Sequence, residues 1–218
     1  MKKIISLFKR DYDGTHHVYD EIVPGAEWVQ RGEGVATLKI DGTCCLVRDG
    51  KLFRRYDRKL TRSARKRKKS NADFVPLLEH FKPAPDAWEA AEPEPNKHTG
   101  HWPGWLPVGD GPEDKWHWEG FEFLCAAWDG ADCFSEADGT YELIGPKVQG
   151  NPYKLDEHRL SRHGGVHIPS APRGFAQLGM YFVINEIEGI VWHHPDGRMV
   201  KIKRKDFGYE WPVKQEAE

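Results

Sequence analysis

The chain has 218 residues, of which 39% are hydrophobic and 30% charged, and its formal net charge at pH 7 is −2. This composition predicts a globular protein with a hydrated surface, and no apolar run approaches the roughly 18 residues that cross a membrane. The sequence therefore excludes an integral membrane protein. Because Lys9, Arg10 and Asp11 end the apolar patch at the N-terminus, it also predicts no signal peptide and a cytoplasmic or nuclear location.

The first part of the chain predicts short strands and a hairpin. Residues 1–33 are typical of a short strand or helix with turns, and residues 34–57 alternate well enough for two strands around Asp49-Gly50. A two-residue turn at that dipeptide would pair Cys44 with Arg55.

A basic run follows the hairpin. Residues 58–69 contain no acidic side chain, and the spacing of apolar residues predicts a helix over 62–81. Such a run is typical of a solvated helix face, and the alternative is a surface that contacts the phosphates of a nucleic acid. The candidate nucleic-acid-binding residues are Arg65, Lys66, Arg67, Lys68 and Lys69.

The proline-rich segment 82–115 predicts a long loop or lid. Its tryptophans at 88, 102 and 105 favour docking against the body of the protein over stacking on bases. Beyond it the chain predicts strands at 117–128, 140–145, 187–193 and 199–207, with a short helix over 178–184.

The cysteines and histidines predict no metal site. The cysteines at 44, 45, 125 and 133 lack the paired spacing of a zinc site, and the histidines form no H-E-x-x-H motif. All four cysteines are therefore interpreted as structural thiols.

Lys39 is the residue that indicates chemistry. It lies in an apolar, strand-like run directly before Ile-Asp-Gly-Thr, where a lysine ammonium would be costly to bury. An uncharged lysine amine is a good nucleophile, and nearby cations favour that form. The hairpin would deliver Arg55 to this end of the strand, although strand parity leaves Arg54 open as the residue on the same face.

A second charged hairpin is predicted near the C-terminus, around Asp196-Gly197. If its turn has two or four residues, Glu188, Lys201 and Lys203 point to one face; a three-residue loop would separate the carboxylate from the lysines. One carboxylate and two lysines on one face suit a metal-bound phosphate chain, and the alternative is a salt-bridged surface hairpin.

One reaction uses all of these groups. The Lys39 amine would attack the α-phosphate of a nucleoside triphosphate and release pyrophosphate. Lys201 and Lys203 would bind the phosphates and lower the pKa of Lys39 by like-charge repulsion. Magnesium, positioned partly by Glu188, would neutralise the charge that develops on the phosphates.

A series of motifs resembles those of covalent nucleotidyltransferases, which include RNA ligases, DNA ligases and capping enzymes: KIDGT (39–43), YELIG (141–145), EGIV (188–191) and KIK (201–203). The chain is more similar still to the animal-type ATP-dependent 5′–3′ RNA ligases. It shares with them the sequence GVAT before Lys39 and the sequence DGTCC after it. Further shared motifs are FKPAP (81–85), PGWLPV (103–108) and GNPY (150–153). The resemblance spans about residues 33–212.

The resemblance implies an RNA ligase acting in RNA repair. Lys39 would carry AMP, pass it to an RNA 5′-phosphate, and the adenylylated end would then be sealed to an RNA 3′-hydroxyl. It implies ATP and Mg²⁺ or Mn²⁺, with Glu188 supporting the metal and Glu142 contacting either the metal or the ribose. The residues that would bind the nucleotide are Lys39, Arg55, Glu142, Glu188, Lys201 and Lys203.

The implied fold class is α+β, a nucleotidyltransferase (ATP-grasp-like adenylation) domain with antiparallel sheets lining a nucleotide cleft. We expect one such domain over residues 1–218, without a C-terminal accessory domain and acting as a monomer. The residue that stacks on adenine is left open between Tyr141 and His163. Alternatives are a DNA ligase, a GTP-dependent capping-type enzyme, or an inactive nucleotide- or RNA-binding protein.

Overall fold

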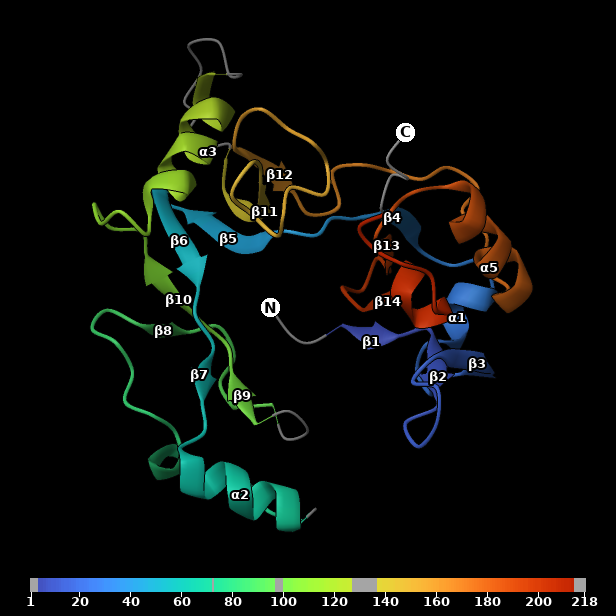
Figure 1. The fold of residues 1–218 in the computed structure, drawn as a ribbon, viewed down its shortest axis with the longest axis horizontal. Coiled ribbons are helices and arrows are strands. Elements are labelled where there is room, and N and C mark those ends of the chain that lie inside the picture. The colour runs from blue at the N-terminus through green and yellow to red at the C-terminus, as the bar shows by residue number, and fades with distance from the viewer. Residues whose placement is uncertain (1–3, 72, 97–99, 127–136, 214–218) are drawn as a thin grey trace. The chain divides into compact units, whose positions relative to one another are not determined.

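The computed structural model describes residues 4–71, 73–96, 100–126 and 137–213, and these form two compact units (Figure 1). The lysine unit, named for its active-site candidates, comprises Ile4–Gly42, Ile144–Asp156 and Ser161–Glu218. The hairpin unit comprises Thr43–Leu143 and Glu157–Leu160. Among the described helices, none is long and apolar enough to cross a membrane.

The lysine unit is built on a four-stranded sheet with the strand order β1-β14-β13-β4. Its strands are β1 (Ile5–Ser6), β14 (Met199–Lys203), β13 (Gly189–His193) and β4 (Val35–Lys39). β1 is parallel to β14, whereas β13 is antiparallel to both of its neighbours. The unit also contains β2 (Phe8–Arg10), β3 (Val18–Ile22), α1 (Glu27–Gln30), α5 (Phe175–Ile184) and the 3-10 helix η2 (Arg204–Phe207).

One face of this sheet forms the core of the lysine unit. Alternate residues of β13 and β14 are fully buried there: Ile190, Trp192, Val200 and Ile202. They pack in one cluster with Leu178 and Phe182 of α5. Because successive strand residues point to opposite faces, the residues between them lie on the other side of the sheet, away from this core.

The hairpin unit is built on a six-stranded sheet with the order β12-β11-β5-β6-β10-β8. Its strands are β12 (Arg159–Arg162), β11 (Gly139–Ile144), β5 (Thr43–Arg48), β6 (Lys51–Arg55), β10 (Gly104–Pro107) and β8 (Glu89–Ala90). The remaining elements are β7 (Arg58–Lys59), β9 (His101–Trp102), α2 (Arg62–Ser70), α3 (Lys115–Ala126) and the 3-10 helix η1 (Leu78–His80). Antiparallel sheets with few helices agree with the predicted α+β class.

The Asp49-Gly50 hairpin is confirmed. β5 pairs with β6 in the expected register, with Arg48 opposite Lys51. Both turn residues have positive φ, 51° at Asp49 and 68° at Gly50, as a two-residue turn between twisted strands requires. Residues 34–57 nevertheless hold three strands rather than two, because β4 ends at Lys39 and belongs to the other sheet.

The predicted helix over 62–81 is too long. α2 ends at Ser70, and Asn71 has an extended backbone, with φ −139° and ψ 108°. Pro76 follows, and a proline disfavours helix in the residue before it. The apolar residues that suggested a longer helix divide accordingly: Phe74 and Phe81 are buried, whereas Leu77 and Leu78 are exposed.

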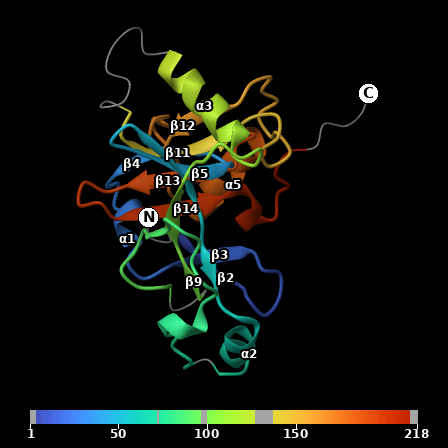
Figure 2. The same cartoon turned by 90° about the vertical axis from the view of Figure 1, so that its left-hand side faces the viewer.

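The predicted strand at 117–128 is wrong, because residues 115–126 form α3. The buried residues of α3 are His117, Gly120 and Phe121, which have the three- and four-residue spacing of a helix. A Cβ atom at Gly120 would lie 2.7 Å from Leu143, so the helix packs closely against β11 (Figure 2). The strands predicted at 140–145 and 187–193 and the helix at 178–184 are confirmed as β11, β13 and α5. The strand predicted at 199–207 is too long, because β14 ends at Lys203 and Arg204–Phe207 form the 3-10 helix η2.

The described residues of the segment 82–115 are packed into the hairpin unit, as its tryptophans predict. The Trp88 indole donates a hydrogen bond to the carbonyl of Tyr56 at 3.0 Å, and that of Trp102 donates to Glu92 at 2.8 Å. Trp105 is buried within β10. Short strands β8, β9 and β10 therefore replace the expected irregular loop.

The prediction that the cysteines are free structural thiols is confirmed for Cys44 and Cys45. Cys125 is disulfide-bonded, so its assignment as a structural thiol is wrong, and Cys133 lies outside the described residues.

The hairpin turn generates a stability prediction. Gly50→Ala places a Cβ atom at a φ of 68°, so we expect the free energy of unfolding to fall by about 1 kcal/mol. Gly179→Ala in α5 is the control: its nearest neighbour would be Phe207 at 3.6 Å, and alanine should stabilise that helix by about 0.5 kcal/mol or more. Urea denaturation measures both, and effects of the same sign would contradict the turn assignment.

Candidate active site

Three lysines lie on the face of the lysine-unit sheet that points away from the core. Lys39 of β4 and Lys203 of β14 both lie opposite Gly189 on the central strand β13. Lys201 lies opposite Val191, two residues along the same strand. Directly opposed residues of an antiparallel ladder project to the same face, so strand register alone groups these amines.

The Glu188 carboxylate bridges two of the lysines. Its Oε2 atom accepts a hydrogen bond from the Lys39 ammonium at 2.7 Å, and its Oε1 atom lies 2.8 Å from the Lys203 ammonium. The Glu188 side chain is only 4% exposed, compared with 18% for Lys39. A buried carboxylate needs such partners, because an unpaired charge is strongly disfavoured away from water.

Strand alternation alone would place Glu188 on the face opposite to Lys201 and Lys203, yet its carboxylate contacts Lys203. His194 donates its backbone N–H to Arg198, so three residues, 195–197, close the loop. A three-residue loop was expected to separate Glu188 from the lysines. Glu188 precedes the first residue of β13, so it does not follow the alternation of the strand, and Gly189 places no side chain between Lys39 and Lys203.

Lys201 is the electrostatically perturbed lysine of this cluster. Its pKa is lowered from 10.5 to about 8, first by burial and then by repulsion from Lys203 and Lys39. The sequence analysis did not predict a lowered pKa for Lys201, whose burial only the folded structure reveals. With one carboxylate among three lysines, this face has a positive excess that suits an anionic ligand.

The segment after Lys39 is held by two aromatic residues that the sequence reasoning did not select. The Asp41 backbone N–H donates to the Tyr153 hydroxyl at 2.7 Å, and the Trp211 indole donates to the Asp41 carboxylate at 2.9 Å. The two rings lie 5.9 Å apart. Tyr153 belongs to the GNPY motif, so the motif could have indicated it, whereas nothing in the sequence points to Trp211.

Arg55 and Glu142 belong to the hairpin unit and lie near Cys44. Glu142 is directly opposite Cys44 in the β11–β5 ladder. Burial, followed by the charge of Glu142, raises the pKa of the Cys44 thiol to about 12, and Arg55 opposes that rise. Arg55 also forms an ion pair with Asp57 at 2.5 Å. The predicted site residues therefore form two groups, one in each unit.

Of the two candidates for stacking on adenine, Tyr141 is buried within the hairpin unit. It is 1% exposed, and its hydroxyl donates to the carbonyl of Ala137 at 2.6 Å. Its ring is part of the packing between strands, so no face is open to a base. His163 is half-buried.

The candidate nucleic-acid-binding residues 65–69 lie on α2, whereas Arg58 and Lys59 of the basic run form β7. Thr61 caps the helix, and its hydroxyl accepts from the backbone N–H of Ala64 at 3.4 Å. Arg67 stacks over the Phe74 ring at 4.8 Å, whereas Arg65, Lys68 and Lys69 line one pocket. The five candidate residues therefore do not all share one setting.

The carboxylates have the ligand type that magnesium takes. Mg²⁺ is held in enzymes by one or two carboxylates together with substrate phosphate oxygens. Glu188 and Glu142 are the predicted ligands, and both supply carboxylate oxygens. Both oxygens of Glu188 contact lysines, so a metal there would share this carboxylate with the Lys39 and Lys203 ammonium groups.

Comparison with known proteins identifies related chains. Residues 16–124 and 134–217 match the family model described as RNA ligase 1. The chain is 34% identical to RNA ligase 1 of Danio rerio and 35% identical to that of Mus musculus, and each alignment covers 82% of this chain and 68% of the relative. RNA ligase 1 of Pongo abelii is 33% identical, over 82% of this chain and 69% of its own length.

The lowered pKa of Lys201 predicts a pH-dependent gain in stability for Lys201→Met. Because the unfolded chain binds this proton more tightly, the amine destabilises the fold fully below about pH 8, and this penalty fades as pH rises toward 10.5. We expect Lys201→Met to raise the free energy of unfolding by about 2 kcal/mol at pH 7, allowing for partial solvent screening, and by much less at pH 10.

Urea denaturation at the two pH values makes this measurement. Lys205→Met, at an exposed position of η2, is the control and should change the stability little at either pH. A loss of stability for Lys201→Met at pH 7 would contradict the assigned electrostatics.

Proposed function

The chain belongs to the RNA ligase 1 family, and on this premise we propose that it is an ATP-dependent RNA ligase that joins RNA 5′-phosphate and 3′-hydroxyl ends. The observation that carries the proposal is the environment of Lys39. Its amine lies 2.7 Å from a buried carboxylate, on a sheet face with two further lysines. An amine that can lose its proton beside groups that bind phosphate suits covalent nucleotide transfer.

In the first step, the Lys39 Nζ atom attacks the α-phosphorus of ATP. A P–N bond forms, the bond from the α-phosphorus to the bridging oxygen breaks, and pyrophosphate leaves. Lys39 must be uncharged to attack, and Glu188, hydrogen-bonded to it, is positioned to accept the proton. Lys201 and Lys203 stabilise the negative charge of the phosphates through their ammonium groups.

Two further transfers complete the proposed reaction. An RNA 5′-phosphate oxygen attacks the lysyl-AMP phosphorus, so that Lys39 leaves and a 5′–5′ pyrophosphate linkage forms. The 3′-hydroxyl of a second RNA end then attacks the original 5′-phosphorus, loses its proton and displaces AMP. Throughout, the chain positions phosphates with fixed cations, which is the main catalytic contribution available to proteins in phosphoryl-type transfer.

Arg55 and Glu142 are assigned to ATP binding, and Glu142 and Glu188 to Mg²⁺ or Mn²⁺. When bound, the metal supplies positive charge to the phosphate oxygens and the leaving group. The proposal includes a nucleotidyltransferase (ATP-grasp-like) fold, with which the antiparallel sheets are compatible, and a monomer acting in the cytoplasm or nucleus.

The covalent intermediate generates the first prediction. Incubation with ATP should add AMP to the protein, and peptide mass spectrometry should locate the adduct at Lys39. Lys39→Ala should abolish the adduct, because it removes the attacking nitrogen, while the exposed-lysine control Lys51→Ala should retain it. An adduct that persists in Lys39→Ala would show that the nucleophile is another residue.

Substrate preference separates the proposal from its alternatives. α-Labelled ATP should label the protein more strongly than α-labelled GTP, and the ATP-loaded protein should join 5′-phosphorylated RNA faster than the matching DNA strands. Labelling by GTP alone would indicate a capping-type enzyme, and preferential joining of DNA a DNA ligase. RNA binding without labelling by either nucleotide would indicate an inactive binding protein.

A further inference from the structure

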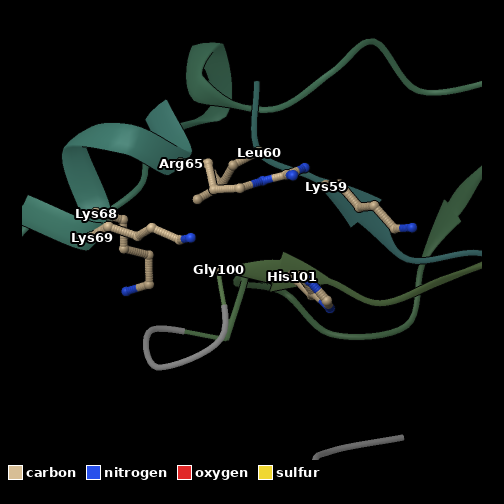
Figure 3. Close-up of a pocket in the computed structure, with 7 residues that line it drawn as sticks. All are labelled: Lys59, Leu60, Arg65, Lys68, Lys69, Gly100 and His101. Atoms are coloured by element: carbon tan, nitrogen blue, oxygen red, sulfur yellow. The ribbon is translucent and has the colours of Figure 1, made fainter. Parts of the chain in front are cut away.

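A basic pocket lies in the hairpin unit, where α2 meets the two-stranded β7–β9 ladder (Figure 3). Its volume is about 330 Å³. Side chains from three separate segments surround one hollow, and the lining residues are Lys59, Leu60, Arg65, Lys68, Lys69, Gly100 and His101. Besides three of the candidate residues 65–69, the pocket includes Lys59 from β7 and His101 from β9.

Only some of the basic residues of α2 line the pocket. Arg65 and Lys69, four residues apart, lie on the face of α2 that lines the pocket. Arg62 and Lys66 have the same spacing and the same residue types, are equally exposed, and do not line it. The sequence run 65–69 therefore contains residues in two different settings.

The pocket has a packed base. Leu60 and Ala64 are buried in a small apolar cluster with Phe74 and Phe81, which fixes α2 on β7. A Cβ atom at Gly100, where φ is 65°, would lie 2.7 Å from the Leu60 side chain, so glycine permits the two segments to approach this closely. The basic side chains thus extend from a scaffold that is already ordered.

Most of the residues that line the pocket are basic. Among the described residues that line it are two lysines and an arginine from α2 and a third lysine from β7, with no carboxylate. His101 Nδ1 lies 4.0 Å from the carboxylate of Asp57, which also forms an ion pair with Arg55. Like charges around one hollow repel one another, and an anion in the hollow would relieve that repulsion.

Helix electrostatics account for only part of this arrangement. Cations in the last turn of a helix are favoured by its dipole, which explains Lys68 and Lys69 on α2. The dipole gives no reason for Lys59 and His101 to converge on the same hollow from two strands. A ligand that is itself anionic explains all of them.

We propose that this pocket binds a backbone phosphate of the RNA substrate, in addition to the groups that handle ATP and the RNA end. The inference rests on the proposed ligase function, which supplies RNA as the polyanion. Lysine and arginine contacts to phosphates position a nucleic acid without reading its sequence. The pocket therefore raises affinity for RNA of any sequence, and this contribution weakens as salt increases.

The test compares matched double variants of the full chain, Arg65→Ala/Lys69→Ala against Arg62→Ala/Lys66→Ala. Both remove one arginine and one lysine from the same helix at the same spacing. Fluorescence anisotropy with a single-stranded RNA bearing a 5′-hydroxyl, at 50 to 200 mM salt, measures the affinity. We expect the pocket variant to flatten the plot of log affinity against log salt by about 0.7 to 1.4, and the control to keep the slope of the unsubstituted chain.

Lys59→Ala adds a test at a position outside the candidate nucleic-acid-binding residues 65–69. It lies outside α2, and the proposal requires it to weaken RNA binding in the same direction as the pocket double variant. Equal losses in the two double variants, or an unchanged slope for the pocket variant and Lys59→Ala, would overturn the proposal. Circular dichroism and thermal unfolding check that each variant is folded.

The source of the phosphate and the ligase function are tested separately. A loss that occurs with 5′-phosphorylated RNA but not with 5′-hydroxyl RNA would assign the pocket to the terminal phosphate and overturn the backbone assignment. Formation of Lys39–AMP by the unsubstituted chain, measured without RNA, tests the ligase function independently. If Lys39–AMP forms but the salt slopes of the two double variants do not differ, the phosphate-binding pocket is refuted and the ligase function is not. If the slopes differ but Lys39–AMP does not form, the ligase function is refuted and phosphate binding in the pocket is not.

Discussion

The arrangement of the candidate site depends on the contact of one buried carboxylate with two ammonium groups. Glu188 is 3% exposed, so its charge is tolerable only because Lys39 and Lys203 each supply a charge-assisted hydrogen bond. Removing either lysine would leave the buried Glu188 carboxylate with one ammonium partner instead of two, in a site with little access to water. The contact also joins residues that are 149 positions apart in the chain, so it ties β4 to the C-terminal hairpin.

That contact follows from the register of β13 between its two neighbours. The register that places Ile190 and Ile202 in the core also places Lys39 and Lys203 on the opposite face, each beside Gly189. A slip of one residue would turn the lysines into the apolar core and expose the isoleucines. The same strand register therefore sets both the apolar core and the grouping of the lysine amines. Packing of the core thereby maintains the geometry of the site.

Sequence reasoning predicted what local chemistry determines. Asp49-Gly50 specifies its own hairpin, and alternation specifies β13 and β14 together with the face that carries Lys201. It failed where tertiary contacts decide. In residues 115–126 the apolar side chains fit the two-residue period of a strand as well as the three- to four-residue period of a helix. The segment forms a helix, in which Gly120 packs closely against Leu143. The lowered pKa could not be assigned to Lys201 either, because its largest cause is burial, which only the folded structure reveals.

The same contact that positions Lys39 also opposes its proposed chemistry. The Lys39 ammonium donates to this carboxylate at 2.7 Å, and an amine must give up a proton before it can attack phosphorus. A triphosphate on this face would change that balance, because its oxygens offer Lys201 and Lys203 a stronger anionic partner than a shared carboxylate does. Once Lys203 turns from Glu188 to a phosphate, Glu188 loses one of its two compensating charges and becomes a stronger base toward Lys39. Substrate binding would thereby favour the proton transfer that activates the nucleophile, and the ion pair would keep the lysine charged and unreactive until the nucleotide arrives.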